Sequence, residues 1–345
     1  MLTDDTLREG MQSPGFALSY NEKMELARLI SIAGVKRSLV AYPSAHKSEF
    51  QVAKDIADKR YFNEIFALGR TIKADIDLIN DTGANISLHL PFKIDNMNDI
   101  YENIKYACTL GKIVEVGFVD IDMFDINEIL KFCNKMAELN VDVVQLPDTR
   151  GKMEPEAMKK IIEAASKIKG IKIEAHCHND HGLAMANSIS AISSGADYID
   201  TTIFGMGERN GIADSITVVD YLNRHGIEGD INIDSMRMAY NYMYDIIIRK
   251  IGDKFFTDNM PVYGNNSEIQ TAGTHVAYGS VFSANHYSVN VYTGRKMIIE
   301  ILKNNNIQYN ENNIGNIVKR IKDESASRGE ALPVSDIIKI AGDTL

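Results

Sequence analysis

The chain has 345 residues, 45% hydrophobic and 24% charged, which is typical of a globular enzyme with one large domain, alone or with an appendage. Its 47 acidic and 37 basic side chains give a net charge of -10 without a lysine-arginine run, which argues against a nucleic-acid partner. No apolar run approaches the roughly 20 residues of a membrane span, and a strand-like segment begins at the second residue. We therefore expect a cytoplasmic protein with no signal peptide and no membrane partner.

Eight strand-like segments alternate with helical patterns over the first 225 residues or so. Units of roughly 25 to 30 residues imply parallel strands with right-handed crossovers, and eight of them favour a closed (β/α)8 TIM barrel over an open doubly wound sheet, the alternative. The glycine run GMGERNG follows the eighth strand with the wrong spacing for a dinucleotide site. The segments are 2–7, 37–42, 62–68, 86–91, 113–118, 141–146, 171–176 and 198–204.

The alternation ends near residue 228. A long helical pattern, a stretch rich in Gly, Asn and Ser, and two more helical patterns follow. We predict a catalytic barrel over 1–228 and a mainly helical C-terminal linker or lid subdomain over 229–345. Three scattered cysteines, none in a CxxC pair, indicate reduced thiols and not a disulfide framework or a zinc-thiolate cluster: Cys108, Cys133 and Cys177.

The stretch EAHCHNDHG on the seventh strand concentrates groups that can carry chemistry. The strand period of two points Glu174, His176 and His178 to one side, at the barrel mouth where catalytic groups of this fold lie. Two histidines at i and i+2 can bind one divalent ion, and Glu9, at the end of the neighbouring first strand, offers the third ligand. This N/N/O set suits Mg, Mn, Co or Zn. Structural histidines and a charge-rich capping turn at DDTLREG are the alternatives.

Three segments, in this order, carry a family resemblance: DDTLREGMQSPG, HCHNDHGLAMANS and GMGERNG. They resemble the DRE-TIM metallolyases, in the branch of the isopropylmalate, homocitrate, citramalate and Re-citrate synthases. TAGTHVAYG and VYTGRK extend the resemblance into the C-terminal region. The Glu of REG, together with GERNG, looks closer to homocitrate and Re-citrate synthases.

The resemblance implies a Claisen condensation of acetyl-CoA, or another acyl-CoA, with a 2-oxo acid, followed by thioester hydrolysis, in a biosynthetic pathway such as that of an amino acid. A metal at Glu9, His176 and His178 would polarise the ketone, and Arg8 would stabilise the developing alkoxide. Arg8 beside Glu9 also suggests an anion site, because burying an unmatched cation is costly.

Other roles come from the resemblance alone. It assigns His275 as the base, with Tyr287 beside it, and Thr149 and Arg70 as ligands of the substrate carboxylates. Glu174 joins the substrate-binding set because it shares a side of the strand with the histidines.

One departure from the family follows the fifth strand. In VGFVDIDMFD, Ile121 takes the place of a family glutamate and Asp125 that of an arginine. Either Asp120 or Asp122 substitutes, or the substrate differs. Arg150 could restore a positive charge from the next loop, so we include it as a substrate-binding residue.

The resemblance further implies a homodimer in which the C-terminal subdomain crosses to the partner barrel, and no regulatory domain. Two other functions stay open. One is a carbon-carbon lyase similar to hydroxymethylglutaryl-CoA lyase or the hydroxy-oxoacid aldolases. The other is a non-catalytic, metal-binding barrel. The sequence does not identify the oxo acid, the metal, the stereochemistry or any inhibitor.

Overall fold

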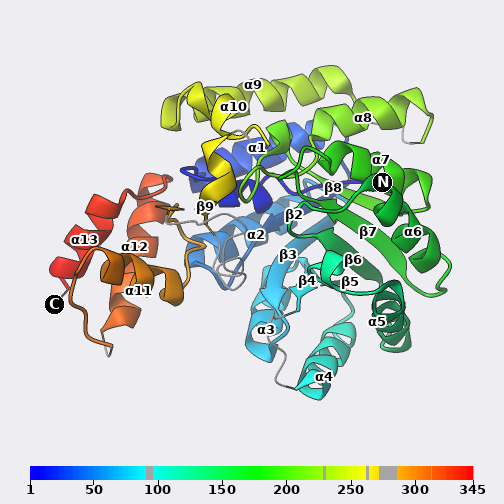
Figure 1. Cartoon of the computed structure of the whole chain (residues 1–345), viewed down its shortest axis with the longest axis horizontal. Helices are drawn as coiled ribbons and strands as arrows, with labels where there is room; N and C mark the ends of the chain where they lie inside the picture. Colours follow the sequence, from blue (N-terminus) through cyan, green and yellow to red (C-terminus); the bar gives the residue numbers. More distant parts are fainter. Residues whose placement is uncertain (91–95, 228–230, 262–263, 272–285, 312, 345) are drawn as a thin grey trace.

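Eight parallel strands close into a barrel in chain order, as predicted (Figure 1). The computed structural model describes residues 1–90, 96–227, 231–261, 264–271, 286–311 and 313–344. The strands are β1 (Leu2–Asp4), β2 (Arg37–Ala41), β3 (Glu64–Arg70), β4 (Asn85–His89), β5 (Val114–Gly117), β6 (Val143–Asp148), β7 (Lys172–Cys177) and β8 (Tyr198–Thr201).

A helix follows every strand and covers the outside of the barrel (Figure 1). In α5, the expected apolar face buries Ile129, Cys133 and Met136, whereas Ile126 in the first turn is 37% exposed. The helices are α1 (Tyr20–Ile32), α2 (Lys47–Lys59), α3 (Lys73–Thr82), α4 (Met97–Cys108), α5 (Ile126–Glu138), α6 (Pro155–Ala165), α7 (Ala184–Ser193) and α8 (Ser215–Arg224).

Barrel closure brings the two ends of the sequence pattern together. β1 pairs with both β2 and β8, with Leu2 opposite Ile199 and Asp4 opposite Thr201. The short helix η1 (Glu9–Gln12) follows β1 at the carboxyl end of the strands. Residues 5–12 therefore share the barrel mouth with the ends of β7 and β8.

The C-terminal part contains two kinds of helix. The helices α9 (Ile233–Lys250) and α10 (Lys254–Asp258) add apolar residues to the core of the barrel, and α9 runs beside α1 and α8 (Figure 1). A second core lies among α11 (Arg295–Asn304), α12 (Ile314–Arg328) and α13 (Val334–Gly342), and includes Val289. Two short strands, β9 (Ile269–Gln270) and β10 (His286–Tyr287), precede these helices. The predicted boundary at residue 228 stays a prediction.

The second core is attached to the barrel of its own chain. The Asn290 side chain donates to the carbonyl oxygen of Met11 at 2.7 Å, and the Tyr292 hydroxyl donates to Glu49 at 2.8 Å. These contacts hold the segment before α11 against η1 and α2. The predicted crossing to a partner barrel stays a prediction.

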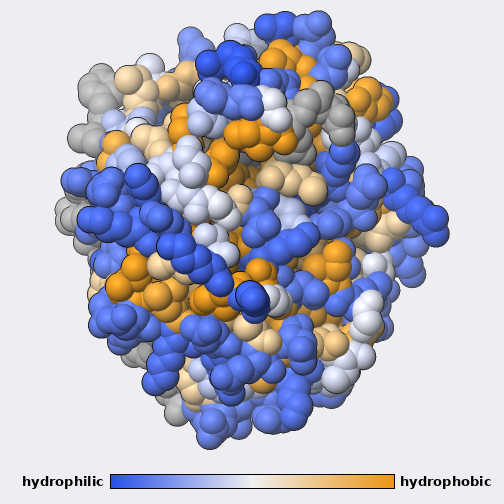
Figure 2. All heavy atoms as spheres, turned by 90° about the vertical axis from the view of Figure 1, so that its right-hand side faces the viewer, coloured by the Kyte–Doolittle hydropathy of each residue, from blue (hydrophilic) through white to orange (hydrophobic). Residues whose placement is uncertain are grey.

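The surface offers no segment that could span a membrane within the part of the chain that the structure describes. Hydrophilic residues dominate the face in Figure 2, with hydrophobic patches scattered among them.

Candidate active site and metal centre

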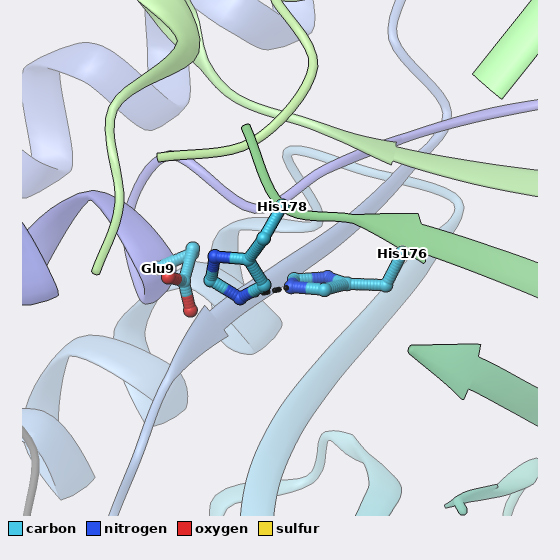
Figure 3. A group of neighbouring side chains, drawn as sticks. All are labelled: Glu9, His176 and His178. Atoms are coloured by element: carbon cyan, nitrogen blue, oxygen red, sulfur yellow. Dashed lines mark hydrogen bonds between the residues drawn. The ribbon is translucent and has the colours of Figure 1, made fainter. Parts of the chain in front are cut away.

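The three predicted metal ligands converge at the barrel mouth (Figure 3). Glu9 begins η1, His176 lies on β7, and His178 follows the end of that strand. One ligand atom from each lies within 4.8 Å of the others, and the side chains are nearly inaccessible, with exposures of 2%, 4% and 3%. The sequence thus correctly predicts that these three residues meet.

The spacing of the donor atoms fits a single divalent ion. The Nε2 atoms of His176 and His178 lie 3.2 Å apart and face one another. Two nitrogens bound to one ion at roughly 2.1 Å each, in tetrahedral geometry, lie at about this separation. Two imidazole nitrogens and a carboxylate oxygen suit several first-row metals, because this donor set is neither very soft nor very hard.

His176 is held in a form that can bind a metal. Its Nδ1 lies 2.8 Å from Asp200, and the Gln145 amide donates to the same carboxylate at 2.7 Å. We assign the ring proton to Nδ1, which leaves the Nε2 lone pair directed to the centre. Burial lowers the pKa of His176 to about 4, so the imidazole is neutral near pH 7.

Glu9 is oriented by its neighbours. One carboxylate oxygen accepts from the guanidinium of Arg8 at 2.5 Å, and the other accepts from the backbone N–H of Glu208 at 2.8 Å. The loop can approach this closely because residue 207 is glycine. A Cβ at Gly207 would lie 2.8 Å from Glu9 Oε1 and 3.1 Å from Gly211 Cα. The GMGERNG segment therefore supports a metal ligand instead of a dinucleotide.

The guanidinium of Arg8 is locked in place. It pairs with Asp5 through Nε and Nη2, and donates from Nη1 to Glu9 and, at 2.9 Å, to Gln12. These contacts use four of its five N–H groups. Asp5 and Glu9 already supply negative charge, so the argument that burial of Arg8 requires an external anion is wrong. Its remaining N–H is the part available to a substrate oxygen.

Two predicted substrate residues lie on the loop after β6. Thr149 is 6% exposed, and its hydroxyl accepts from the backbone N–H of Asp120 at 3.0 Å. Arg150 forms an ion pair with Asp122, and its side chain is 21% exposed. Both residues thus connect the loop after β6 to the loop after β5. The positive charge of Arg150 is balanced by Asp122 and is not free.

Glu174 is not one of the three converging residues, and it is linked to His176 through Asp200. It is fully buried inside the barrel, where it accepts from Arg37 at 2.8 Å. The strand period correctly places Glu174 inside the barrel. Side chains two residues apart on β7 both point inward but lie at different levels along the barrel axis, so Glu174 pairs with Arg37 in the interior whereas His176 reaches the mouth. A direct substrate contact by Glu174 is not supported by this position.

The other predicted residues are not among the three converging residues within the described chain. The side chain of Arg70 is 61% exposed and pairs with Asp75 at 2.8 Å. Tyr287 packs against the second core. Burial, and to a smaller extent a hydrogen bond with Glu300, raise its pKa to about 12. His275 lies outside the described residues.

Sequence reasoning missed three residues that the structure brings to the site. Asp200 could have been found from strand pairing, because Glu174 lies opposite Tyr198 and two further residues along each strand reach His176 and Asp200. Gln12 lies one helical turn after Arg8.

The third missed residue is His89, at the carboxyl end of β4, where residues of a parallel barrel commonly act. Its Nε2 has no hydrogen-bond partner among the described residues. Burial, and then the charge of Arg8, lower its pKa to about 3. A Cβ at Gly117 would lie 2.9 Å from His89 Cδ2, so the glycine that ends β5 makes room for this ring.

The departure after β5 has a structural explanation in part. Ile121 is fully buried in the core, and Asp125 caps the amino end of α5 by accepting from the N–H groups of Asn127 and Glu128. Asp125 therefore has a local helix-capping role. Asp120 and Asp122 remain the candidates for the role of the family glutamate that Ile121 replaces.

The chain matches the HMGL-like family over residues 1–243. A probable 2-isopropylmalate synthase of Methanopyrus kandleri is 28% identical over 99% of this chain and 73% of its own length. The 2-isopropylmalate synthase of Sulfurisphaera tokodaii is 32% identical over 79% of this chain and 74% of its own. An Archaeoglobus fulgidus relative that carries the name (R)-citramalate synthase is 29% identical over 80% and 58%. The ranking toward homocitrate and Re-citrate synthases stays a prediction.

Solved structures support the same fold. The carboxyl transferase domain of Rhizobium etli pyruvate carboxylase superposes with a TM-score of 0.64 at 14% identity, over 76% of this chain and 50% of that one. Bacillus subtilis HMG-CoA lyase superposes with a TM-score of 0.61 at 16% identity, over 71% and 92%. At these identities the likeness concerns the barrel alone.

Proposed function

Because the chain belongs to the HMGL-like family, we propose that it catalyses a divalent-metal-dependent Claisen condensation of acetyl-CoA, or another acyl-CoA, with a 2-oxo acid. Hydrolysis of the thioester then releases CoA and a 2-hydroxy di- or tricarboxylic acid. The names of the similar proteins, isopropylmalate and citramalate synthases, support an acyltransferase of this class. The identity of the oxo acid is left open.

The observation that carries the proposal is the convergence of Glu9, His176 and His178 beside a locked arginine. A 2-oxo acid offers two adjacent oxygens, one from the keto group and one from the carboxylate, that can occupy the open positions of such a site. A divalent ion held there would supply Lewis-acid polarisation of the keto group.

The side chains of this chain position and stabilise the reactants. In this proposal the N–H of Arg8 that its ion pairs and hydrogen bonds leave over donates to the oxygen that gains negative charge. Asp200 keeps the proton of His176 on Nδ1. In this proposal the Thr149 hydroxyl and the guanidinium of Arg150, on the loop after β6, bind the far end of the oxo acid, where they also contact Asp120 and Asp122.

The base assigned by the resemblance is His275, with Tyr287 beside it. The homodimer, in which His275 would serve the neighbouring active site, is also part of the proposal, and Tyr287 packs against the second core. Light scattering tests the dimer. A monomer with full activity would contradict it.

The test is release of free thiol from acetyl-CoA, with Mn or Mg, and with each of five acids in turn: oxaloacetate, 2-oxoglutarate, 2-oxoisovalerate, pyruvate and phosphonopyruvate. We expect a metal-dependent signal with one acid, lost on chelation and restored by added metal. His178→Ala should abolish it. Silence with every acid, together with cleavage of a hydroxyacyl-CoA without thiol release, would replace the proposal with a lyase.

A further inference from the structure

Asp120 occupies an unusual place at the barrel mouth. It follows the end of β5 and begins η2 (Ile121–Met123), with φ 56° and ψ 48°. This left-handed conformation is uncommon for a residue other than glycine, and such residues gather at functional sites. The loop therefore fixes the position of the Asp120 side chain.

The carboxyl group of Asp120 is buried and incompletely satisfied. The residue is 3% exposed, and Oδ1 has no hydrogen-bond partner among the described residues. The backbone N–H donates to the Thr149 hydroxyl at 3.0 Å, which ties Asp120 to the loop after β6. A buried carboxyl oxygen without a donor is costly unless it carries a proton or meets a ligand.

The neighbouring carboxylates all have donors. Asp122 pairs with Arg150, and Asp180 pairs with Arg209 at 2.5 Å. Asp148 accepts from two backbone N–H groups at 3.0 Å each. Among the described carboxylates of these loops, Asp120 alone keeps an oxygen with no donor.

The charges that face Asp120 leave it able to exchange a proton. Burial, and then the charge of Asp122 on the same turn, raise its pKa, whereas Arg150 from the β6 loop and Arg209 from the β8 loop lower it, and the net pKa is about 6. The charge of Arg209 also acts on Glu9, so Asp120 and the metal ligands share one electrostatic environment. A group of this kind is suited to proton transfer near neutral pH.

We propose that Asp120 is the proton-exchanging carboxyl group of this active site and does the work of the glutamate that Ile121 replaces. This inference rests on the proposed condensation, and it gives Asp120 the role of base in place of His275. It also decides between the two neighbouring candidates, because Asp122 is held by Arg150 whereas Oδ1 of Asp120 has no donor among the described residues.

In the condensation, a C–H bond of the thioester methyl group breaks and its proton passes to the Asp120 carboxylate. The electron pair of that bond forms the new C–C bond with the keto carbon. The π pair of the ketone moves to its oxygen, which takes the proton back from Asp120. The carboxylate is regenerated, and no further reactant is needed.

The experiment compares Asp120→Asn with Asp125→Asn, a matched change at an exposed residue five positions along, where asparagine still caps α5. Thiol release, Mn binding by titration calorimetry, and exchange of methyl deuterium from deuterated acetyl-CoA are measured for both. We expect Asp120→Asn to lower kcat by about 10²- to 10⁴-fold, with a smaller change in KM, unchanged Mn affinity and no exchange. Asp125→Asn should stay within about twofold of wild type.

The pH dependence separates proton transfer from a structural role. Because the base must be deprotonated, kcat/KM of the wild type should rise with pH through an apparent pKa near 6. Added formate should restore part of the activity of Asp120→Ala. An Asp120→Asn enzyme within about twofold of wild type, or one that loses Mn binding together with activity, would overturn the inference. Silence of the wild type with every acid would instead defeat the proposed function, and this inference with it.

Discussion

Two groups of charged residues lie inside the barrel, and they differ in whether the protein completes them. The mouth cluster consists of Glu9, His176 and His178. The interior cluster consists of Arg37, Glu115 and Glu174. All of these side chains are buried, so burial of charge does not by itself distinguish an active site from a structural ion pair.

The interior cluster satisfies its own charges. Arg37 donates to both carboxyl groups of the cluster and to Glu64 at its outer edge, and its guanidinium lies between the rings of Phe66 and Tyr198, 3.9 and 4.2 Å from their centroids. Its charge is therefore matched on the edge and on both faces.

The two carboxyl groups of the interior cluster have different pKa shifts. Burial raises the pKa of Glu115 well above its usual value. Burial acts the same way on Glu174, but Arg37 and several hydrogen bonds outweigh it and lower the pKa of Glu174 to about 2. The two carboxyl groups of the cluster therefore differ in how readily they take up a proton.

The mouth cluster has a geometry that a metal ion could complete. The two histidine nitrogens face one another at 3.2 Å, an arrangement that two neutral acceptors would avoid unless a proton or a cation lies between them. The comparison teaches that the direction of lone pairs toward a common point identifies the functional cluster.

The largest effect should come from His178→Ala. Loss of one ligand removes metal binding, and since a bound metal contributes several kcal/mol to the transition state, we expect turnover to fall by about a thousandfold or more. Calorimetry with Mn and thiol release measure both losses. The exposed His225 provides the matched control as His225→Ala, which should bind Mn normally.

The metal also gives this variant a second readout. At about a hundred times its Kd, Mn should stabilise the wild type by about 2.7 kcal/mol, because it binds only the folded state. His178→Ala should show no such shift. A variant that still gains stability from Mn would mean that the ion binds elsewhere.

Arg37→Met should damage the fold instead. It leaves Glu115 and Glu174 buried without their cation, and removing one partner of such a group costs about 3 to 5 kcal/mol. Urea titration measures the loss. Adding Glu115→Gln and Glu174→Gln should recover part of it. Loss of Mn binding at unchanged stability would contradict the division between the two clusters.

Arg150→Ala should have a moderate effect on substrate binding. Because Asp122 already balances the charge, we expect the apparent KM for the oxo acid to rise by about tenfold, or about 1.4 kcal/mol, with less change in kcat. Steady-state kinetics with the acid that supports thiol release measure it. An unchanged KM would refute a substrate contact by Arg150.

The sequence was informative where period and chain order determine position. Eight alternating units predicted the barrel, and the period of two predicted that His176 and His178 share a side. The period of the strand does not show how deep in the barrel a side chain lies or which residue it contacts. Glu174 shares the side of the histidines but lies with Arg37, whose role in strand β2 no local pattern indicates. Asp200 likewise needed the register of β8 against β7.

The smallest effect should come from Asp220→Asn, which breaks an ion pair at the surface. This substitution replaces a carboxylate with an amide, as Glu174→Gln does, but at a position exposed to solvent. Asp220 and Arg224 lie one turn apart on α8, 2.8 Å from each other, with side chains 50% and 63% exposed. Solvent and salt screen such a pair, so Asp220→Asn should change the free energy of unfolding by only about 0.3 to 0.5 kcal/mol, and by less in high salt. Urea titration at low and high salt measures this. A loss as large as that of Arg37→Met would mean that charge pairing, and not burial with matched partners, sets the stability of the interior cluster.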